Sequence, residues 1–366
     1  MEPHLAENFG NPSSLHRWGR AARNSIETAR EGIADLLGVD AGEVFFVRGG
    51  TEADNLAVLG RARPGLRIGD RTRIVVSAIE HSAVREAALQ AEREGAEVHH
   101  VGVDPEAGLD LAHLDALLDE QPALVSIMWV NNEIGAVLPV AEVGARCRAA
   151  GVPYHTDAVQ ALGRVPVHLA DSPVDLVTFS GHKLGGPKGT GVLVLRSGIK
   201  LDPLHYGGGQ EDGIRPGTQD VAGAVGVWTA FRLALGERES EAQRLESLRD
   251  SLAEGLSRHL PDLRVHGAGL ERAPHILNVG VRDVDGATLM MALDLQGVAV
   301  SQGSACSSGA SRRSHVLEAL YGEQAEAATP IRFSLGLGTD EPEIEEAVRR
   351  TVAAVEKINM LERVGR

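Results

Sequence analysis

The chain has 366 residues, 43% of them hydrophobic, and a formal net charge of −15 from 36 basic and 51 acidic residues. This length is enough for two domains with buried cores, while the negative charge argues against stable nucleic-acid binding. Only two cysteines are present, which excludes a disulfide framework and a cysteine-rich zinc site.

The N-terminal residues Met1-Glu2-Pro3-His4-Leu5 have neither the basic region nor the apolar core of a signal peptide. No apolar run in the sequence reaches the length of a membrane span. We therefore expect a cytoplasmic protein that does not bind membranes.

Strand-like and helical patterns alternate through the first half of the chain. The predicted helices span residues 17–37, 51 onward, 82–94, 111–118 and 140–150. The predicted strands span residues 44–47, 73–78, 98–103, 124–130 and 176–179. This alternation predicts a mostly parallel sheet with helices on both faces and ligands at the strand ends.

Polar or small residues follow several of these strands. Gly49-Gly50 and Thr51 open a helix, a pattern that suits an anion but that any tight strand-to-helix turn would also show. His81 lies at a strand-to-helix corner, where a histidine is more often solvated than functional. Asn131-Asn132-Glu133 follow the strand at 124–130 and are costly there unless they bind something.

The segment Ser180-Gly181-His182-Lys183 follows the apolar run at 176–179. A lysine at the end of a buried strand must be paired, solvated or neutralised, so Lys183 suits a nucleophilic amine. The alternative is a surface lysine with an extended stem. A phosphate-binding Walker loop around Lys188 is excluded, because Pro187 separates Gly186 from the lysine.

The second half begins with a glycine-rich stretch at 205–218, which we interpret as a functional loop that would suit a subunit contact. A long helix over 221–259 is interrupted near Gly236, and we place the domain junction there. The large domain would span residues 1–236 and the small domain residues 237–366. Further strands are predicted at 276–281, 298–301 and 331–335, with helices at 285–295, up to 320 and from 340, the last with Thr339 as N-cap.

The two cysteines have different surroundings. Cys147 falls within the helix at 140–150 and is interpreted as inert, whereas Cys306 lies among Ser, Ala and Gly in a loop. A cysteine in a loop of small residues is either reactive or accidental. A reactive thiol, a nucleophilic lysine and an anion site together suggest pyridoxal phosphate chemistry.

Nine motifs then occur in order along nearly the whole chain. They are Asn11-Pro12-Ser13-Ser14, Gly50-Thr51-Glu52-Ala53-Asp54-Asn55, Glu80-His81, Val130-Asn131-Asn132-Glu133-Ile134-Gly135, Asp157-Ala158-Val159-Gln160, Ser180-Gly181-His182-Lys183, Arg215-Pro216-Gly217-Thr218, Gly303-Ser304-Ala305-Cys306 and Ile331-Arg332-Phe333-Ser334-Leu335-Gly336. Together they closely resemble the NifS/IscS-type cysteine desulfurases of the class V aminotransferase group. The resemblance implies a fold-type I pyridoxal-phosphate enzyme, an α/β protein with a mostly parallel central sheet and a smaller α+β C-terminal domain.

The resemblance also implies cofactor-binding residues. Lys183 would bind the cofactor covalently and carry the substrate α-proton, and Asp157 would pair with the ring nitrogen. His81 would stack on the ring, with proton transfer as a second implied role. Gln160 would bind the ring hydroxyl oxygen. The phosphate would be held by Gly50, Thr51, Ser180, Gly181, His182 and Thr218, the last from the second subunit of a homodimer.

For the substrate, L-cysteine, the resemblance implies that Asn132 and Arg332 orient it, the arginine by clamping the carboxylate. The Cys306 thiolate would attack the substrate sulfur, release alanine and keep a persulfide. The sulfur would then pass to an acceptor or iron–sulfur scaffold protein, for cluster assembly or tRNA thiolation. The Ser-Ala-Cys loop resembles the longer-loop group of the family.

Two departures from the family pattern stand out. Family members begin with a Tyr-Leu-Asp-Asn-Ala-Ala-Thr-Thr-like segment, and the present sequence begins after it, so we expect weaker substrate binding or small-domain folding. Val47-Arg48 replace a Thr-Ser pair, and Arg48 would either add charge near the phosphate or face solvent. Two alternatives stay open: another class V lyase, such as a selenocysteine lyase, and an inactive protein that only docks sulfur acceptors.

Overall fold

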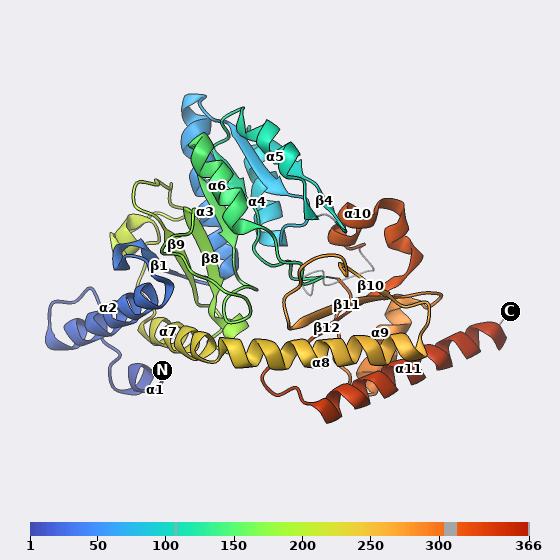
Figure 1. Ribbon diagram of the computed structural model, residues 1–366. Helices are drawn as coiled ribbons and strands as arrows, with labels where there is room; N and C mark the ends of the chain where they lie inside the picture. The colour runs from blue at the N-terminus through green and yellow to red at the C-terminus, as the bar shows by residue number, and fades with distance from the viewer. Residues whose placement is uncertain (107, 304–312, 365–366) are drawn as a thin grey trace. The chain divides into compact units, whose positions relative to one another are not determined.

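The computed structural model describes residues 1–106, 108–303 and 313–364 (Figure 1). The chain divides into two compact units. The first comprises Met1–Val101, Asp110–Trp129 and Pro139–Arg238, and the second comprises Gly102–Leu109, Val130–Leu138 and Glu239–Arg366. The chain therefore enters the second unit twice before its main C-terminal part.

A seven-stranded sheet forms the centre of the first unit. Its order is β1-β9-β8-β7-β6-β2-β3, with β1 (Val44–Val47), β9 (Gly191–Leu195), β8 (Leu176–Ser180), β7 (Tyr154–Asp157), β6 (Leu124–Ser126), β2 (Arg73–Ser77) and β3 (Glu97–Val101). Neighbours from β8 to β3 are parallel, and β9 is antiparallel to both β8 and β1. The carboxyl ends of six strands therefore meet at one edge.

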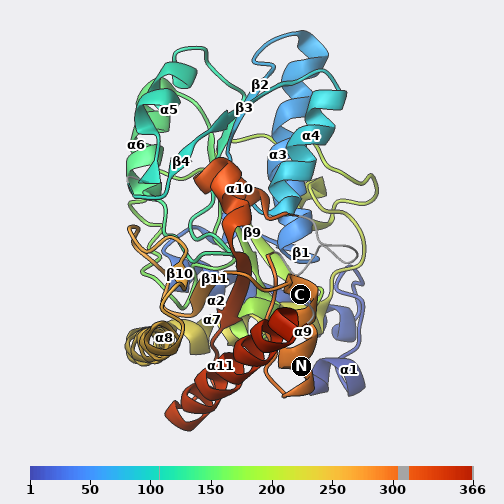
Figure 2. The ribbon, with the colours of Figure 1, turned by 90° about the vertical axis from the view of Figure 1, so that its right-hand side faces the viewer.

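Helices cover both faces of this sheet (Figure 2). On one face, α3 (Gly50–Ile68) and α4 (Ser82–Arg93) pack together, and their alanines and leucines join apolar side chains of β1, β2, β6, β8 and β9 in one core. On the other face lie α5 (Leu111–Leu118) and α6 (Val140–Ala150). The strands are buried on both sides, which explains their continuous apolar runs.

A second layer of the first unit is formed by two packed helices, α2 (Arg17–Leu37) and α7 (Val221–Gly236). Their contact is built from small residues, including Ala22, Ala29 and Ala224. The remaining short elements are the helix α1 (Glu2–Ala6) and the 3-10 turns η1 (Ala41–Glu43), η2 (Gly181–Leu184) and η3 (Gln210–Gly213). Of these, η2 matters most here because it follows β8 directly.

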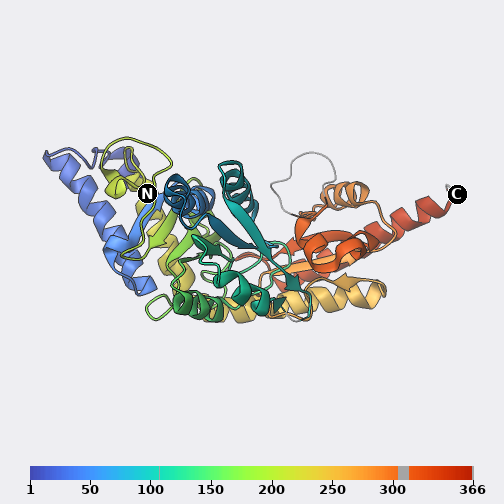
Figure 3. The same ribbon diagram turned by 90° about the horizontal axis from the view of Figure 1, so that it is seen from above.

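The second unit contains an antiparallel sheet of order β10-β11-β12, formed by β10 (Arg264–Val265), β11 (Ile276–Val281) and β12 (Thr329–Ser334). Its core joins these strands to α8 (Arg238–His259), α9 (Gly286–Leu295) and α11 (Glu341–Val364), the last helix of the described chain (Figure 3). The unit also holds α10 (His315–Tyr321), η4 (Gly322–Ala327) and the hairpin of β4 (Val103–Asp104) and β5 (Gly108–Leu109).

Three local predictions differ from the structure. Residues 298–301 form no strand and make one isolated bridge, Ser301 with Arg332. The strand predicted at 124–130 ends at Ser126. The N-cap of α11 is Asp340 rather than Thr339, because Asp340 Oδ1 accepts the Glu343 N–H while Thr339 Oγ1 accepts the Gly336 N–H. In the described part of the chain, no helix is long and apolar enough to cross a membrane.

Candidate active site

The turn between β1 and α3 presents the positively polarised start of a helix. Gly49 precedes the helix with φ of 113°, a conformation that favours glycine, and no side chain caps the helix there. The first N–H groups of α3, from Gly50 and Thr51, therefore face outward with the positive end of the helix dipole. Such a helix start is suited to a phosphate group.

Ser180, at the end of β8, lies next to this turn. A Cβ at Gly191, on the strand between them, would lie 2.7 Å from Gly49 Cα and 2.7 Å from the Phe179 carbonyl oxygen. The backbones thus approach as closely as glycine allows. Ser180 Oγ in turn lies 2.8 Å from Nδ1 of His182 in η2. A hydroxyl and an imidazole therefore border the N-terminus of α3.

Asp157 ends β7 and is 4% exposed. Its Oδ1 accepts the Val159 N–H at 2.9 Å. Burial raises the pKa of the Asp157 carboxyl, and the nearby His81, the Val159 N–H and the charge of Lys183 act in the opposite direction. Such a carboxyl binds most favourably to a group that supplies its own positive charge.

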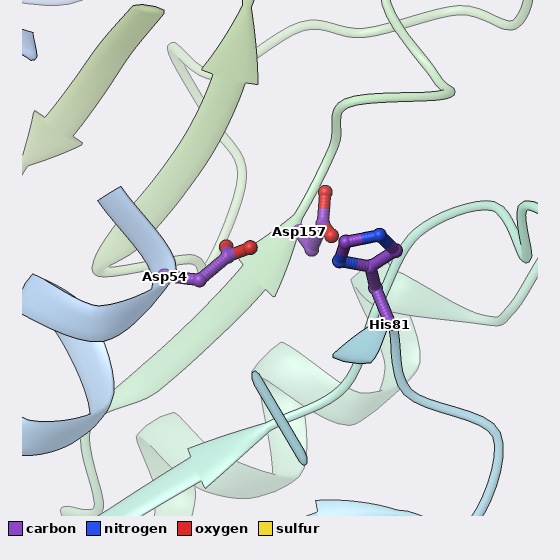
Figure 4. A group of neighbouring side chains, drawn as sticks. All are labelled: Asp54, His81 and Asp157. Atoms are coloured by element: carbon purple, nitrogen blue, oxygen red, sulfur yellow. The ribbon is translucent and has the colours of Figure 1, made fainter. Parts of the chain in front are cut away.

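His81 is the N-cap of α4, and its Nδ1 accepts the Ala83 N–H at 3.1 Å. This bond fixes the ring and leaves Nε2 for another partner. Figure 4 shows Asp157 between the His81 ring and Asp54 of α3, and one side-chain ligand atom from each of the three lies within 4.8 Å of the others. His81, at the start of α4, and Asp157, at the end of β7, therefore lie close together.

Three further predicted residues of the first unit lie on different segments. Lys183 is exposed in η2, two residues after Gly181, which is buried. Gln160 is half-buried in the turn that follows Asp157. Thr218 lies on an exposed segment after η3, and its contribution from a second subunit stays a prediction.

This edge of the sheet fits pyridoxal phosphate. The α3 N-terminus with Ser180 would bind the phosphate, Asp157 the ring nitrogen, and Lys183 the aldehyde carbon. The fit also rests on geometry, because a Cβ at Gly50 would come within 2.9 Å of Val159 Cγ2 and narrow the space beside the helix start.

Arg48, the unusual residue beside this turn, has a defined partner. Its Nη1 lies 3.6 Å from Oδ2 of Asp220, and both side chains are partly exposed. Its backbone N–H donates to Glu52. Arg48 thus pairs with the N-terminal cap of α7.

A group of buried polar residues near Asp157 was not singled out by the sequence patterns. Asp54 and His155 are 1% and 0% exposed, and Thr178 and Ser126 are also buried. His155 Nδ1 lies 2.8 Å from Ser126 Oγ, and its Nε2 lies 3.0 Å from Thr178 Oγ1. The only available signal was the placement of a histidine within a buried strand, two residues before Asp157.

Glu80, next to His81, is equally buried. Its Oε1 accepts the Met128 N–H at 2.8 Å and the Ser77 hydroxyl. Burial raises the pKa of Glu80 to about 8, although both hydrogen bonds oppose that shift. The sequence motif Glu80-His81 thus combines a buried acid with a half-buried imidazole.

In the second unit, the two residues predicted to bind substrate are in contact. Arg332 of β12 donates from Nη1 to the Asn132 carbonyl oxygen at 2.9 Å. The turn is held by Asn131, whose Oδ1 accepts the N–H groups of Glu133 and Ile134. This leaves the Asn132 side chain half-buried beside the guanidinium.

The two cysteines can be compared only in part, because Cys306 lies outside the described residues. Cys147 is 0% exposed in α6, and burial raises the pKa of its thiol to about 12. The interpretation of Cys147 as an inert cysteine therefore agrees with its surroundings.

Comparison with known protein families adds a match over residues 1–346 to the aminotransferase class-V family. The chain belongs to the class-V aminotransferase family. Within this class-V family, the cysteine desulfurase IscS of Dictyoglomus turgidum is 39% identical over 361 residues, covering 99% of this chain and 91% of the relative. The resemblance to NifS/IscS-type cysteine desulfurases is confirmed.

Solved structures of class-V relatives agree. A NifS-like protein superimposes with a TM-score of 0.90 at 34% identity, covering 97% of this chain and 94% of that protein. The structure of SspA in complex with cysteine gives a TM-score of 0.79 at 30% identity, covering 91% and 93%. The predicted fold-type I architecture is therefore confirmed.

Proposed function

We propose that this chain is a pyridoxal-phosphate-dependent cysteine desulfurase, which converts L-cysteine to L-alanine and transfers the sulfur to Cys306 as a persulfide. The single observation that carries the proposal is the convergence of Asp157, His81 and the α3 N-terminus at one sheet edge. The class-V family membership and the cysteine desulfurase relatives support it.

The cofactor would be held at three points. Gly50, Thr51, Ser180, Gly181 and His182 would bind its phosphate, Asp157 its ring nitrogen and Gln160 its ring hydroxyl. Lys183 would bond to its aldehyde carbon. When bound, pyridoxal phosphate supplies an electron sink that stabilises negative charge next to the substrate amine.

Two groups of the chain would move protons. The Lys183 amine would take the proton from the substrate Cα and later return a proton to the product. His81 donates no hydrogen bond from Nδ1, because that atom accepts the Ala83 N–H. We therefore assign any proton transfer by His81 to Nε2.

The sulfur step would use Asn132, Arg332 and Cys306. Arg332 would bind the substrate carboxylate and Asn132 would orient the substrate, as polar groups that lie in contact with each other. The Cys306 thiolate would form a new S–S bond as the substrate Cβ–S bond breaks. The electron pair of that bond would stay with the substrate carbon, and protonation of this carbon would yield alanine.

Several features of this proposal concern the intact assembly. We propose a homodimer, with Thr218 of one subunit near the phosphate of the other, and a cytoplasmic location. The persulfide sulfur would pass to an acceptor or iron–sulfur scaffold protein. The C-terminal region from residue 237 would act as the small domain that bears the cysteine loop.

Mass spectrometry after incubation with cysteine tests the proposal. One added sulfur on Cys306, together with one alanine per sulfur, is the expected result. Cys306→Ala should abolish the added mass, whereas the matched variant Cys147→Ala should retain it. Alanine and sulfide release at the wild-type rate by Cys306→Ala would contradict the persulfide step and favour a different class V lyase.

A further inference from the structure

Two carboxyl groups, those of Asp54 and Asp157, share a buried space at the carboxyl end of β7. An oxygen of each lies within 4.8 Å of the other, and both residues are at most 4% exposed. In such surroundings two negative charges cannot both persist without strong compensation, so the pair is expected to hold one proton. The question is which carboxyl holds it.

The partners of Asp157 favour its ionised form. The Val159 N–H donates to it, and the positive Lys183 and the imidazole of His81 lie on its side. In the proposed function, the cofactor ring nitrogen adds a further positive partner. Asp157 therefore has reasons to remain an anion in spite of its burial.

The partners of Asp54 favour its neutral form. Among the described residues, Asp54 Oδ1 has no hydrogen-bond partner, and His155 Nε2 lies 3.6 Å from it. Both nitrogens of His155 already face hydroxyl groups, and burial lowers the pKa of this imidazole to about 3. His155 is therefore neutral and cannot balance a charge on Asp54.

Burial and the negative neighbours of Asp54 outweigh the one hydrogen bond that favours its carboxylate form. Thr178 of β8 gives it one hydrogen bond, which favours the carboxylate, while Glu80 adds negative charge from the segment before α4. Burial, Asp157 and Glu80 together raise the pKa of Asp54 well above its ordinary value. A buried oxygen without a donor is costly as a carboxylate and acceptable as a carboxylic acid.

We propose that Asp54 is a positioning residue that carries the single proton of the buried Asp54–Asp157 pair and so keeps Asp157 as the one anion facing the cofactor ring. This assignment rests on the proposed function for its consequence, although the proton on Asp54 is a property of the chain itself. Asp54 approaches Asp157 from the side opposite His81 (Figure 4).

Two substitutions distinguish the proposed role of Asp54, which is to hold a proton, from a role as a negative charge and from a role in packing. Asp54→Asn preserves the shape of the side chain and a hydrogen-bond donor. Its cofactor affinity should therefore stay within about twofold of the wild type, and the pH midpoint of the bound-cofactor absorbance should move by no more than about a few tenths of a pH unit. Asp54→Ala removes the donor, and should shift that midpoint by about one unit and weaken cofactor binding about tenfold. Circular dichroism checks that both variants fold.

Each other outcome overturns the proposal. Equal shifts in both variants would mean that Asp54 acts through a negative charge. No shift in either, with only a lower melting temperature for Asp54→Ala, would mean that Asp54 serves packing alone. Should Asp54→Ala not fold, Asp54→Asn and the following measurement still decide.

Infrared spectroscopy of the cofactor-free protein provides that independent readout. At neutral pH the carboxylic-acid carbonyl band should shrink in Asp54→Asn, and a separate component should be lost in Glu80→Gln, the other buried acid. An unchanged band in Asp54→Asn overturns the proposal whether or not the cofactor binds. Conversely, a protein with the band but without cofactor absorbance would contradict the proposed function alone.

Discussion

Arg332 and Asn132 are separated by 200 positions in the chain, yet a guanidinium N–H of the first donates to the main-chain carbonyl of the second at 2.9 Å. This bond occupies one of the five N–H donors of the arginine. It also restrains the guanidinium at the turn that contains Asn132. A group that binds a carboxylate benefits from such fixed orientation, because less side-chain freedom is lost on binding.

Replacement of Arg332 should therefore impair substrate binding. We expect Arg332→Ala to raise the KM for cysteine about tenfold to hundredfold, the equivalent of losing hydrogen bonds to a charged group. Arg332→Lys should recover only part of this, since a lysine cannot form the two parallel bonds. Steady-state kinetics measure the effect, with Arg349→Ala, on the exposed face of α11, as the unaffected control. An unchanged KM in Arg332→Ala would assign the arginine to the Asn132 turn alone.

Replacement of Lys183 tests the covalent bond to the cofactor. Lys183→Ala should lose the visible absorbance that borohydride removes, because the amine that forms the bond is gone. The matched variant is Lys188→Ala, an exposed lysine five positions further on, which should behave as the wild type. Retention of borohydride-sensitive absorbance in Lys183→Ala, or its loss in Lys188→Ala, would place the bond elsewhere.

Glu80 should make stability depend on pH. Its folded-state pKa of about 8 lies above the ordinary value near 4.5, so the folded state binds more protons than the unfolded state between these values. Stability should consequently fall as the pH rises through this window. His155, with its pKa lowered to about 3, has the opposite sign but acts only below about pH 6.5.

Urea unfolding between pH 6.5 and pH 8 isolates the Glu80 contribution from that of His155. We expect the free energy of unfolding of Glu80→Gln to fall less steeply with pH than that of the wild type, since an amide does not ionise. Parallel curves for the two proteins would show that the Glu80 carboxyl does not titrate in this range.

Replacement of Gly191 by alanine should force apart two backbone segments that lie close together. A Cβ there would lie 2.7 Å from both Gly49 Cα and the Phe179 carbonyl oxygen. We expect Gly191→Ala to lower the free energy of unfolding by about 1–3 kcal/mol, as overpacking does, and to weaken phosphate binding at the neighbouring turn. Gly42→Ala is the control, because a Cβ there meets no heavy atom within 4 Å. Equal stabilities of the two variants would refute the close approach.

The local pattern of residues was sufficient to predict most helices and strands. Helix α2 begins and ends where its apolar spacing and Gly38 indicate, and β8 ends at Ser180 within one residue of the prediction. Residues 298–301 look equally strand-like, but they pair with Arg332 only through Ser301. A β-rich composition does not reveal whether a neighbouring strand is available.

The candidate site was predictable to the extent that its residues follow strands. His81 follows β2, and Asp157 and Ser180 are the last residues of the parallel strands β7 and β8, so their common edge could be expected. Asp54 could not be found in this way, because it lies inside a helix and its meaning depends on Asp157, His155 and Thr178 from other elements. Buried polar groups of this kind are recognised by their partners in space, which no sequence spacing encodes.

The burial of Cys147 has a practical consequence for a chain with only two cysteines. Its thiol, with a pKa of about 12, is closed to alkylating reagents while the protein is folded. Rapid labelling in native buffer should therefore leave Cys147 unmodified, and Cys147 takes up label only when the fold opens. The fraction of molecules labelled at Cys147 thus measures, in one unmodified sample, how many are unfolded.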